Sequence, residues 1–139
     1  MKYIVMLVMV SLIGCASKSV IPNANNLVAP VVAVPVTLKE VRVEVFFDFD
    51  SSEIRDKTIL DNLKGSLENR VVKITGYCDE VGTEEYNDKL GLNRAIAVAQ
   101  YLSNVSGIGI ETSSKGKSEA HHTTEQLVRQ SDRKVIIES

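Results

Sequence analysis

The sequence has few cysteines, no excess of basic residues and no apolar run long enough to cross a membrane. Its 139 residues include two cysteines, and the formal net charge is −2. Nucleic-acid-binding proteins typically carry a basic patch, so this charge balance argues against nucleic acid as a partner. The apolar run from Tyr3 to Ile13 is broken only by Ser11. It is well short of the roughly 20 residues that a membrane-spanning helix needs.

The usual signatures of enzymes and metal sites are also missing. We find no phosphate-binding glycine loop and no dinucleotide fingerprint. Cys78 has no histidine near it in sequence, and the adjacent Asp79 would tend to raise the pKa of its thiol. His121 and His122 lack the Cys/His spacing of a zinc site, so we expect them in a solvated loop. We therefore predict no enzymatic activity, no cofactor and no bound metal.

The N-terminal residues are typical of an export signal. Met1 and Lys2 give a short positive start, and the apolar run that follows has the length of a signal-peptide core. Residues 12–15, Leu-Ile-Gly-Cys, resemble the bacterial lipobox. That resemblance implies cleavage after residue 14 and acylation of Cys15, and Ala16 in place of an aspartate implies sorting to the outer membrane. The alternative is an ordinary secretory signal that happens to end at a cysteine.

Removal of the predicted signal peptide, residues 1–14, leaves 125 residues, which is enough for one domain. The cleaved segment contains one charged residue, Lys2, so the net charge of the mature chain becomes −3. Once Cys15 is acylated, Cys78 has no partner for an intramolecular disulfide. The folded part must therefore be stabilised by its hydrophobic core.

Residues 15–38 are predicted to be a lipidated N-terminus and a tether. No charged residue occurs between Ser19 and Leu38, and Pro30 and Pro35 favour extended backbone. The part between Val28 and Val36 is more apolar than solvated linkers usually are. It is either a valine-rich extended linker or a strand that adds to the sheet edge of a partner protein. The sequence leaves both possibilities open.

Residues 39–139 are predicted to form the folded domain. Val41, Val43 and Val45 alternate with polar residues, which indicates a strand that runs into two phenylalanines. A helix is expected next, with its start capped by residues 50–53. Its apolar positions are Ile59, Leu60, Leu63 and Leu67. Val72, Ile74 and Gly76 then alternate with polar residues as a second strand.

The second half of the domain is predicted to contain a long helix over residues 84–105. Strands are expected at residues 108–113 and 135–137. The order strand, helix, strand, helix, strand, strand predicts an α/β (α+β) two-layer sandwich, with two main helices packed on a mixed sheet. The core side chains of the long helix are expected to be Tyr86, Leu90, Ala97, Tyr101 and Leu102.

Three segments of this domain resemble one family closely. They are Phe-Phe-Asp-Phe-Asp at residues 46–50, Gly-Tyr-Cys-Asp-Glu-Val-Gly-Thr-Glu-Glu-Tyr-Asn at 76–87, and Leu-Gly-Leu-Asn-Arg-Ala at 90–95. Their joint spacing is similar to that of the OmpA-like peptidoglycan-binding domain, and most of all to its branch of peptidoglycan-associated lipoproteins. The resemblance covers roughly residues 41–138.

The resemblance implies a pocket for the diaminopimelate of the peptidoglycan stem peptide. By motif position, Asp79 would accept the ligand's ammonium group and Arg94 would fork onto its carboxylate, as suits a zwitterion on one carbon. Backbone N–H groups near Gly82 and Thr83, just before the long helix, could bind the same carboxylate. The alternative for Asp79 and Arg94 is a surface ion pair of little consequence.

The resemblance implies weaker roles for four more residues. Phe47 and Asp48 would end the first strand beside the site, Asn87 would fix the loop, and Leu90 would line the wall. The alternatives are that Phe47 is a core aromatic and that Asn87 bonds only its own loop.

The chain also departs from the family pattern at several positions. Tyr77 and Cys78 stand where the family has histidine and a small residue, and Asn93 stands where it has a second arginine or a polar residue. Ala120 replaces a proline, and the family's Asn-Arg-Arg run before the last strand is Asp-Arg-Lys at residues 132–134. These departures leave Asp79 and Arg94 in place.

We therefore predict an outer-membrane lipoprotein, lipid-anchored with its domain facing the periplasm, that binds peptidoglycan and tethers the membrane to the cell wall. A second hypothesis is that the chain is the wall-anchoring subunit of a multiprotein envelope machine, such as a secretion or conjugation apparatus. In that case the segment between Val28 and Val36 would bind an envelope protein partner. A wall hydrolase is a third hypothesis, for which the sequence offers no catalytic residues.

Overall fold

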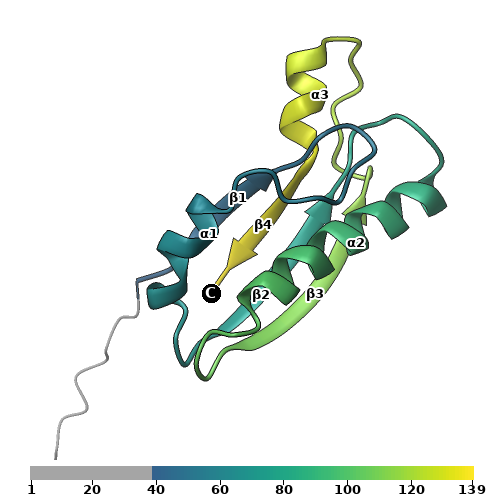
Figure 1. Cartoon of the computed structure of the whole chain (residues 1–139). Helices are drawn as coiled ribbons and strands as arrows, with labels where there is room; N and C mark the ends of the chain where they lie inside the picture. The colour runs from purple at the N-terminus through teal and green to yellow at the C-terminus, as the bar shows by residue number, and fades with distance from the viewer. Residues whose placement is uncertain (1–38) are drawn as a thin grey trace, which may run out of the picture. The chain divides into compact units, whose positions relative to one another are not determined.

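A four-stranded mixed sheet carries two helices on one face and a third helix at one end (Figure 1). The computed structural model describes residues 39–139, so the predicted signal peptide, Cys15 and the tether lie outside the described residues. The elements in chain order are β1 (Arg42–Phe46), α1 (Thr58–Leu63), a short 3-10 turn η1 (Lys64–Ser66), β2 (Val71–Tyr77), α2 (Glu84–Leu102), β3 (Gly109–Gly116), α3 (Gln126–Asp132) and β4 (Lys134–Glu138).

The last strand lies between the first two. The order across the sheet is β1-β4-β2-β3, with β4 antiparallel to both of its neighbours and β2 parallel to β3. The parallel pair is joined by α2, as expected where a helix crosses between two strands. The predicted α/β sandwich with a mixed sheet is confirmed.

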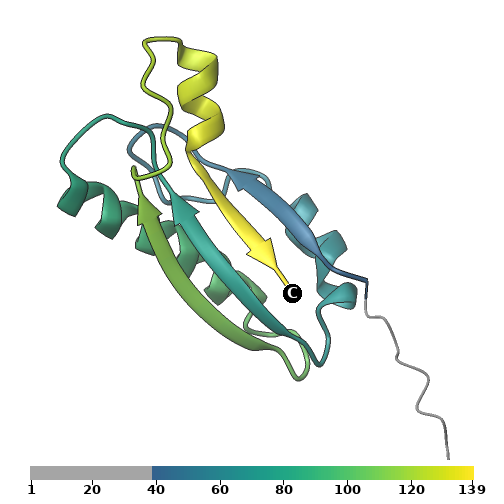
Figure 2. The same cartoon turned by 180° about the vertical axis from the view of Figure 1, so that it is seen from behind.

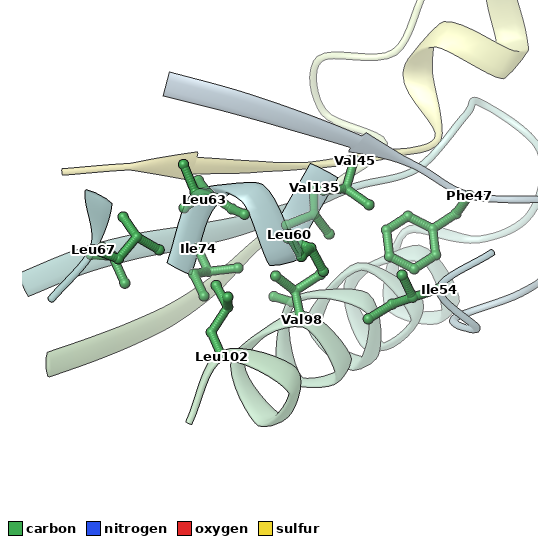
Figure 3. Close-up of a cluster of buried hydrophobic side chains, with 13 residues drawn as sticks. Val45, Phe47, Ile54, Leu60, Leu63, Leu67, Ile74, Val98, Leu102 and Val135 are labelled. Atoms are coloured by element: carbon green, nitrogen blue, oxygen red, sulfur yellow. The ribbon is translucent and has the colours of Figure 1, made fainter. Parts of the chain in front are cut away.

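The hydrophobic core fills the space between the sheet and the helices α1 and α2. Figure 3 shows Leu60 and Leu63 of α1 and Val98 and Leu102 of α2 pointing toward the strands. The opposite face of the sheet carries no helix among residues 39–139, as the view from behind shows (Figure 2). The buried cluster consists of Val45, Phe47, Ile54, Leu60, Leu63, Leu67, Val72, Ile74, Ala95, Val98, Leu102, Val135 and Ile137.

Two glycines bring α2 into backbone contact with β2. A methyl group on Gly76 would lie 1.8 Å from the carbonyl oxygen of Gly91. A methyl group on Gly91 would lie 2.4 Å from Oγ of Ser114 in β3. No other residue type fits at this crossing. Because Arg94 follows Gly91 by one helical turn, the crossing holds that arginine close to the end of β2.

The start of the first helix differs from the prediction. The segment at residues 50–53 forms its own turn, with Oγ of Ser51 accepting from the N–H of Glu53 at 3.1 Å. The helix begins at Thr58, whose N–H donates to Oδ1 of Asp56 at 2.9 Å. Leu60 and Leu63 are buried as predicted, whereas Ile59 is exposed.

Two further corrections concern helices. The sequence analysis did not predict α3, a short helix in which five of the seven residues are polar. On α2, Leu102 is buried as predicted, but Tyr86 is 49% exposed, and the buried face contains Asn87 and Arg94 instead. No helix within residues 39–139 has the length and hydropathy needed to span a bilayer.

Candidate functional site

A hollow opens where the end of β2 meets the first turns of α2. Figure 1 shows that α3 lies at this same end of the sheet. The hollow encloses about 160 Å³. Five of the residues predicted for the site share its walls: Asp79, Gly82, Asn87, Leu90 and Arg94. Its remaining walls come from Phe49, Asp50, Cys78, Val81, Tyr86 and Arg133.

Arg94 is fully buried, and its guanidinium donates to three backbone carbonyls. These are Nε to Ser51 O at 2.7 Å, Nη1 to Tyr77 O at 2.8 Å and Nη2 to Asp48 O at 3.0 Å. Burial lowers the pKa of Arg94, while the negative charges of its neighbours oppose the shift. The arginine therefore ties the segment after β1 to the end of β2, and it brings a positive charge to the wall of the hollow.

Asp79 is also buried, and it pairs with Arg133, not with Arg94. Its Oδ2 accepts from Nη1 of Arg133 at 3.0 Å, and its Oδ1 accepts from the N–H of Val81 at 3.1 Å. Asp79 is 4% exposed and Arg94 is 0% exposed. The alternative of a surface ion pair between Asp79 and Arg94 is therefore wrong, because both groups are buried and no hydrogen bond joins them.

Arg133 is the site residue that the sequence analysis missed. Besides its bond to Asp79, its Nε donates to Phe47 O at 3.3 Å. Its Nη2 makes no hydrogen bond among residues 39–139. Every buried side-chain nitrogen or oxygen in this part of the chain has a partner, so Nη2 is accessible to solvent, and Arg133 lines the hollow. The one signal in the sequence was the position of Arg133 in the run of residues 132–134 before the last strand.

The loop between β2 and α2 is fixed by its own side chains. Thr83 caps the helix, since its Oγ1 accepts from the N–H of Tyr86 at 3.2 Å. Asn87 donates from Nδ2 to the carbonyl oxygens of Val81 at 2.9 Å and Thr83 at 3.1 Å. Gly82 has φ +101°, a conformation that favours glycine. Asn87 therefore fixes the loop, and the side chain of Thr83 serves the helix and does not line the hollow.

The mouth of the hollow is partly aromatic. Phe49 is 61% exposed and Tyr86 is 49% exposed. The hydroxyl of Tyr86 donates to Oδ1 of Asp50, and this bond raises the pKa of the phenol. The bond joins the segment after β1 to the first turn of α2 across the mouth.

Phe47 and Asp48 do not line this hollow. Phe47 belongs to the hydrophobic core, so the alternative interpretation of Phe47 as a core aromatic is confirmed. The centre of its ring lies 5.4 Å from the guanidinium carbon of Arg94. The carboxylate of Asp48 is exposed and accepts from Nη1 of Arg55 at 2.9 Å. Both residues contribute indirectly, because their backbone carbonyls hold Arg133 and Arg94 respectively.

Cys78 lies at the floor of the hollow with its thiol buried. The thiol donates to the carbonyl oxygen of Asn87 at 3.3 Å. Burial raises the pKa of Cys78 to about 11, an effect that the charge of Arg94 only partly offsets. A thiol with this pKa is almost entirely protonated at neutral pH, so it is a poor nucleophile.

The two histidines have different partners. Nδ1 of His121 lies 2.6 Å from Oδ1 of Asp132, and Nδ1 of His122 lies 3.1 Å from Oε2 of Glu80. Within residues 39–139, no three histidine, cysteine or acidic side chains gather closely enough to hold a metal ion.

Comparisons with known proteins give one consistent result. Residues 46–134 match the model of the OmpA family. The chain is 37% identical over 127 residues to a peptidoglycan-associated lipoprotein of Rhizobium meliloti (strain 1021), covering 82% of this chain and 72% of the relative. A peptidoglycan-associated lipoprotein of Agrobacterium fabrum is 33% identical over 128 residues, with the same coverage.

Among solved structures, the peptidoglycan-associated lipoprotein from Burkholderia pseudomallei superposes with a TM-score of 0.56. It is 30% identical in sequence, and the match covers 69% of this chain and 89% of that one.

Proposed function

Because the chain belongs to the OmpA family, we propose that it is an outer-membrane lipoprotein that binds the diaminopimelate of peptidoglycan stem peptides and tethers the membrane to the cell wall. The observation that carries this proposal is the hollow at the end of β2. Its walls include one buried carboxylate, that of Asp79, and two buried arginines, Arg94 and Arg133. The names of the relatives, which are lipoproteins associated with peptidoglycan, support the same reading.

The charges of the hollow suit the free end of diaminopimelate, which has an ammonium and a carboxylate on one carbon. Asp79 is the anion that receives the ammonium. The open Nη2 of Arg133 can donate to the carboxylate, and Arg94 adds its charge from a position fixed by three carbonyls. Charge-assisted hydrogen bonds contribute about 1.5–3 kcal/mol each, so two or three of them give a reversible grip. Leu90 and Val81 offer apolar contact to the methylene chain of the ligand.

Family membership also bears on catalysis. The OmpA family is not a family of enzymes, so the prediction that this chain is not an enzyme is confirmed. The buried, protonated thiol of Cys78 is consistent with this. We propose no cofactor, no metal and no nucleic-acid partner.

The membrane anchor in this proposal is Cys15. Its lipobox-like context supports acylation, and bacterial lipoproteins resemble one another in having three acyl chains, which implies effectively permanent anchoring. Residues 15–38 would then span part of the distance to the wall, with the domain in the periplasm. The 23 residues from 16 to 38 reach at most about 75–80 Å when fully extended.

The test is co-sedimentation of residues 39–139 with purified cell-wall sacculi. Asp79→Asn keeps the size of the side chain and removes its charge, so we expect sedimentation to fall at least tenfold. Arg94→Ala should abolish binding as well, and thermal unfolding will show whether that variant is folded. Arg42→Gln, a change of an exposed arginine at the far end of β1, is the control that should bind like the parent. Equal sedimentation of Asp79→Asn and the parent would overturn the pocket assignment.

A role in a multiprotein envelope machine is the second candidate, favoured by the charge-free, valine-rich segment between Val28 and Val36. Deletion of that segment would release the protein from a large complex while leaving it bound to the membrane. If the size of the complex does not change after the deletion, the segment does not bind a partner protein and acts only as a tether.

A further inference from the structure

A second hollow adjoins the first on the side of α3. It encloses about 350 Å³ and shares Phe49, Asp79, Val81 and Arg133 with the hollow around Arg94. Its other walls are Gln126 and Arg129, both on α3. The ion pair between Asp79 and Arg133 therefore lies between the two hollows. The proposed function uses only the hollow around Arg94, which would bind the zwitterionic end of diaminopimelate.

The second hollow contains an arginine that is held in place and has a donor to spare. Arg129 donates from Nε to Thr123 O at 2.7 Å and from Nη2 to Oε1 of Glu80 at 2.9 Å. Its Nη1 makes no hydrogen bond among residues 39–139, and it is not closed off from solvent. The two existing bonds fix the plane of the guanidinium. A further bond from Nη1 to a ligand would therefore cost little additional side-chain entropy.

The chemistry of the free donors indicates the ligand group. Arg133 lines both hollows and Arg129 lines the second one, and each has a guanidinium nitrogen that makes no hydrogen bond among residues 39–139. Each of the carboxylates nearby is already engaged: Asp79 by Arg133 and Glu80 by Arg129 and His122. An additional acceptor must therefore come from the ligand, and a planar carboxylate is the group that guanidinium donors recognise best. Phe49 and Val81 line both hollows, so an apolar chain can lie across them.

We infer that the hollow beside α3 is a second subsite, in which Arg129 binds a carboxylate of the stem residue next to diaminopimelate. This inference rests on the proposed function. The carboxylate can come from two sources. One is the α-carboxylate of the γ-linked glutamate that precedes diaminopimelate, and the other is the terminal carboxylate of an alanine that follows it. Arg129 is then a specificity residue, which favours peptide-linked diaminopimelate over the free amino acid.

The experiment is calorimetric titration of residues 16–139, the whole chain after the lipid-bearing cysteine, with four probes. These are free diaminopimelate, the tripeptide Ala-γ-Glu-diaminopimelate, the same tripeptide with its glutamate α-carboxylate amidated, and the amidated tripeptide extended by alanine. We expect a peptide that carries the recognised carboxylate to bind about tenfold more tightly than free diaminopimelate, which corresponds to one charge-assisted bond. If the source is the glutamate, the unmodified tripeptide shows this gain and amidation removes it. If the source is the terminal alanine, the two tripeptides bind alike and only the alanine-extended probe shows the gain.

Two substitutions separate ligand contact from a structural role. Arg129→Gln should remove the tenfold gain for the peptide and leave the affinity for free diaminopimelate unchanged. Glu80→Gln should strengthen peptide binding severalfold, because the amide keeps an oxygen acceptor for Nη2 of Arg129 and removes a negative charge that repels the carboxylate of the ligand. If the pair of Arg129 and Glu80 only holds α3 in place, both substitutions weaken all probes alike. Arg42→Gln, which breaks an exposed pair with Glu138, is the matched control.

The outcomes also distinguish this inference from the proposed function. If the parent binds free diaminopimelate but Arg129→Gln leaves the ratio of peptide to diaminopimelate affinity unchanged, only the second subsite is overturned. If the parent binds none of the probes, the pocket assignment itself fails, and the subsite fails with it.

Discussion

The two sides of the Asp79–Arg133 pair are built differently. On the α2 side, Arg94 is buried and bonded to backbone carbonyls, and the helix meets β2 through two glycines. On the α3 side, Arg129 is held by the side chain of Glu80 and by one carbonyl, close to two exposed histidines. Moving the acceptors of Arg94 would displace the end of β2 and the segment after β1 together, whereas an ion pair near the surface exchanges more readily with water and salt. The comparison indicates that the hollow around Arg94, the primary pocket, is rigid and that the hollow beside α3 can adjust its shape.

The glycine crossing is the first place to test the rigid side. Gly76→Ala puts a methyl group 1.8 Å from a backbone oxygen of α2, which can yield only if the whole helix shifts. We expect the free energy of unfolding to fall by about 3 kcal/mol or more, at the upper end for overpacked cores. Urea denaturation measures it. The matched control is Gly65→Ala, because nothing lies within 4 Å of a methyl group there. Equal stability of the two variants would contradict the close approach.

Substitution of the two arginines tests the comparison directly. Arg94→Met removes the guanidinium donor from three backbone carbonyls, of which Asp48 O keeps the N–H of Ser51 at 3.4 Å, and a buried carbonyl left unsatisfied costs about 1–3 kcal/mol. Removal of a buried charge offsets part of this, so we expect a net loss of about 2–3 kcal/mol in unfolding free energy. Arg129→Gln should change the stability little, since its pair is near the surface. Similar losses for both arginines in chemical denaturation would show that the two sides are not different in kind.

The thiol of Cys78 reports on burial of the primary pocket. Because its pKa is raised to about 11 from an ordinary value of 9.0, the thiolate fraction at pH 7.5 is about a hundredfold lower than in the unfolded chain. We expect alkylation of folded residues 16–139 by iodoacetamide to be slower than that of the urea-unfolded chain by at least this factor. Comparable rates for the folded and unfolded chains would show that the pocket floor is open.

The same shift has a consequence for stability at high pH. A pKa raised on folding means that the unfolded chain loses its proton first. The contribution of Cys78 is therefore fully present below about pH 9 and is lost as the pH rises toward 11. The phenol of Tyr86 shifts in the same direction, so the difference between the parent and Cys78→Ala isolates the thiol.

The smallest effect is expected on the α3 side in acid. Hydrogen bonds from Arg129, and secondarily from His122, lower the pKa of Glu80 below its usual value of 4.5. A lowered pKa stabilises the fold above that usual value, and the contribution is lost as the pH falls through the folded-state pKa. We expect the hydrogen-exchange protection of amides in α3, relative to the intrinsic rate at each pH, to fall as the pH drops below 4.5, while the protection of α2 is kept. Glu80→Gln should remove this pH dependence. An equal fall in protection in both helices would contradict it.

Several parts of the fold followed from local patterns. Val43 and Val45, then Val72 and Ile74, alternate with polar residues, and the strands lie where this period predicts them. The long helix begins at Glu84 as predicted because Thr83 caps it. The short α3 was missed because five of its seven residues are polar, and its one buried residue is Asp132, which pairs with His121. Apolar periodicity cannot detect a helix that is docked by hydrogen bonds.

The face of α2 shows the same limit. Counting apolar side chains selected Tyr86 for the core. Asn87 and Arg94 are buried instead, because Nδ2 of Asn87 and all three guanidinium nitrogens of Arg94 donate to backbone carbonyls. Whether a polar side chain can be buried depends on acceptors contributed by distant segments. For Arg94 these come from Asp48 and Ser51, more than forty positions earlier in the chain.

By itself, the sequence determined the positions of the strands and the long helix, the family of the domain and the presence of Asp79 and Arg94 in one motif. Only the tertiary structure decided that Asp79 pairs with Arg133, which is 54 positions away, and that Arg129 stands at an adjoining hollow. Local patterns depend on backbone geometry, which repeats along the chain. The partners of charged groups depend on which strands become neighbours. Because β4 lies between β1 and β2, Arg133, which precedes β4, comes close to Asp79, which follows β2.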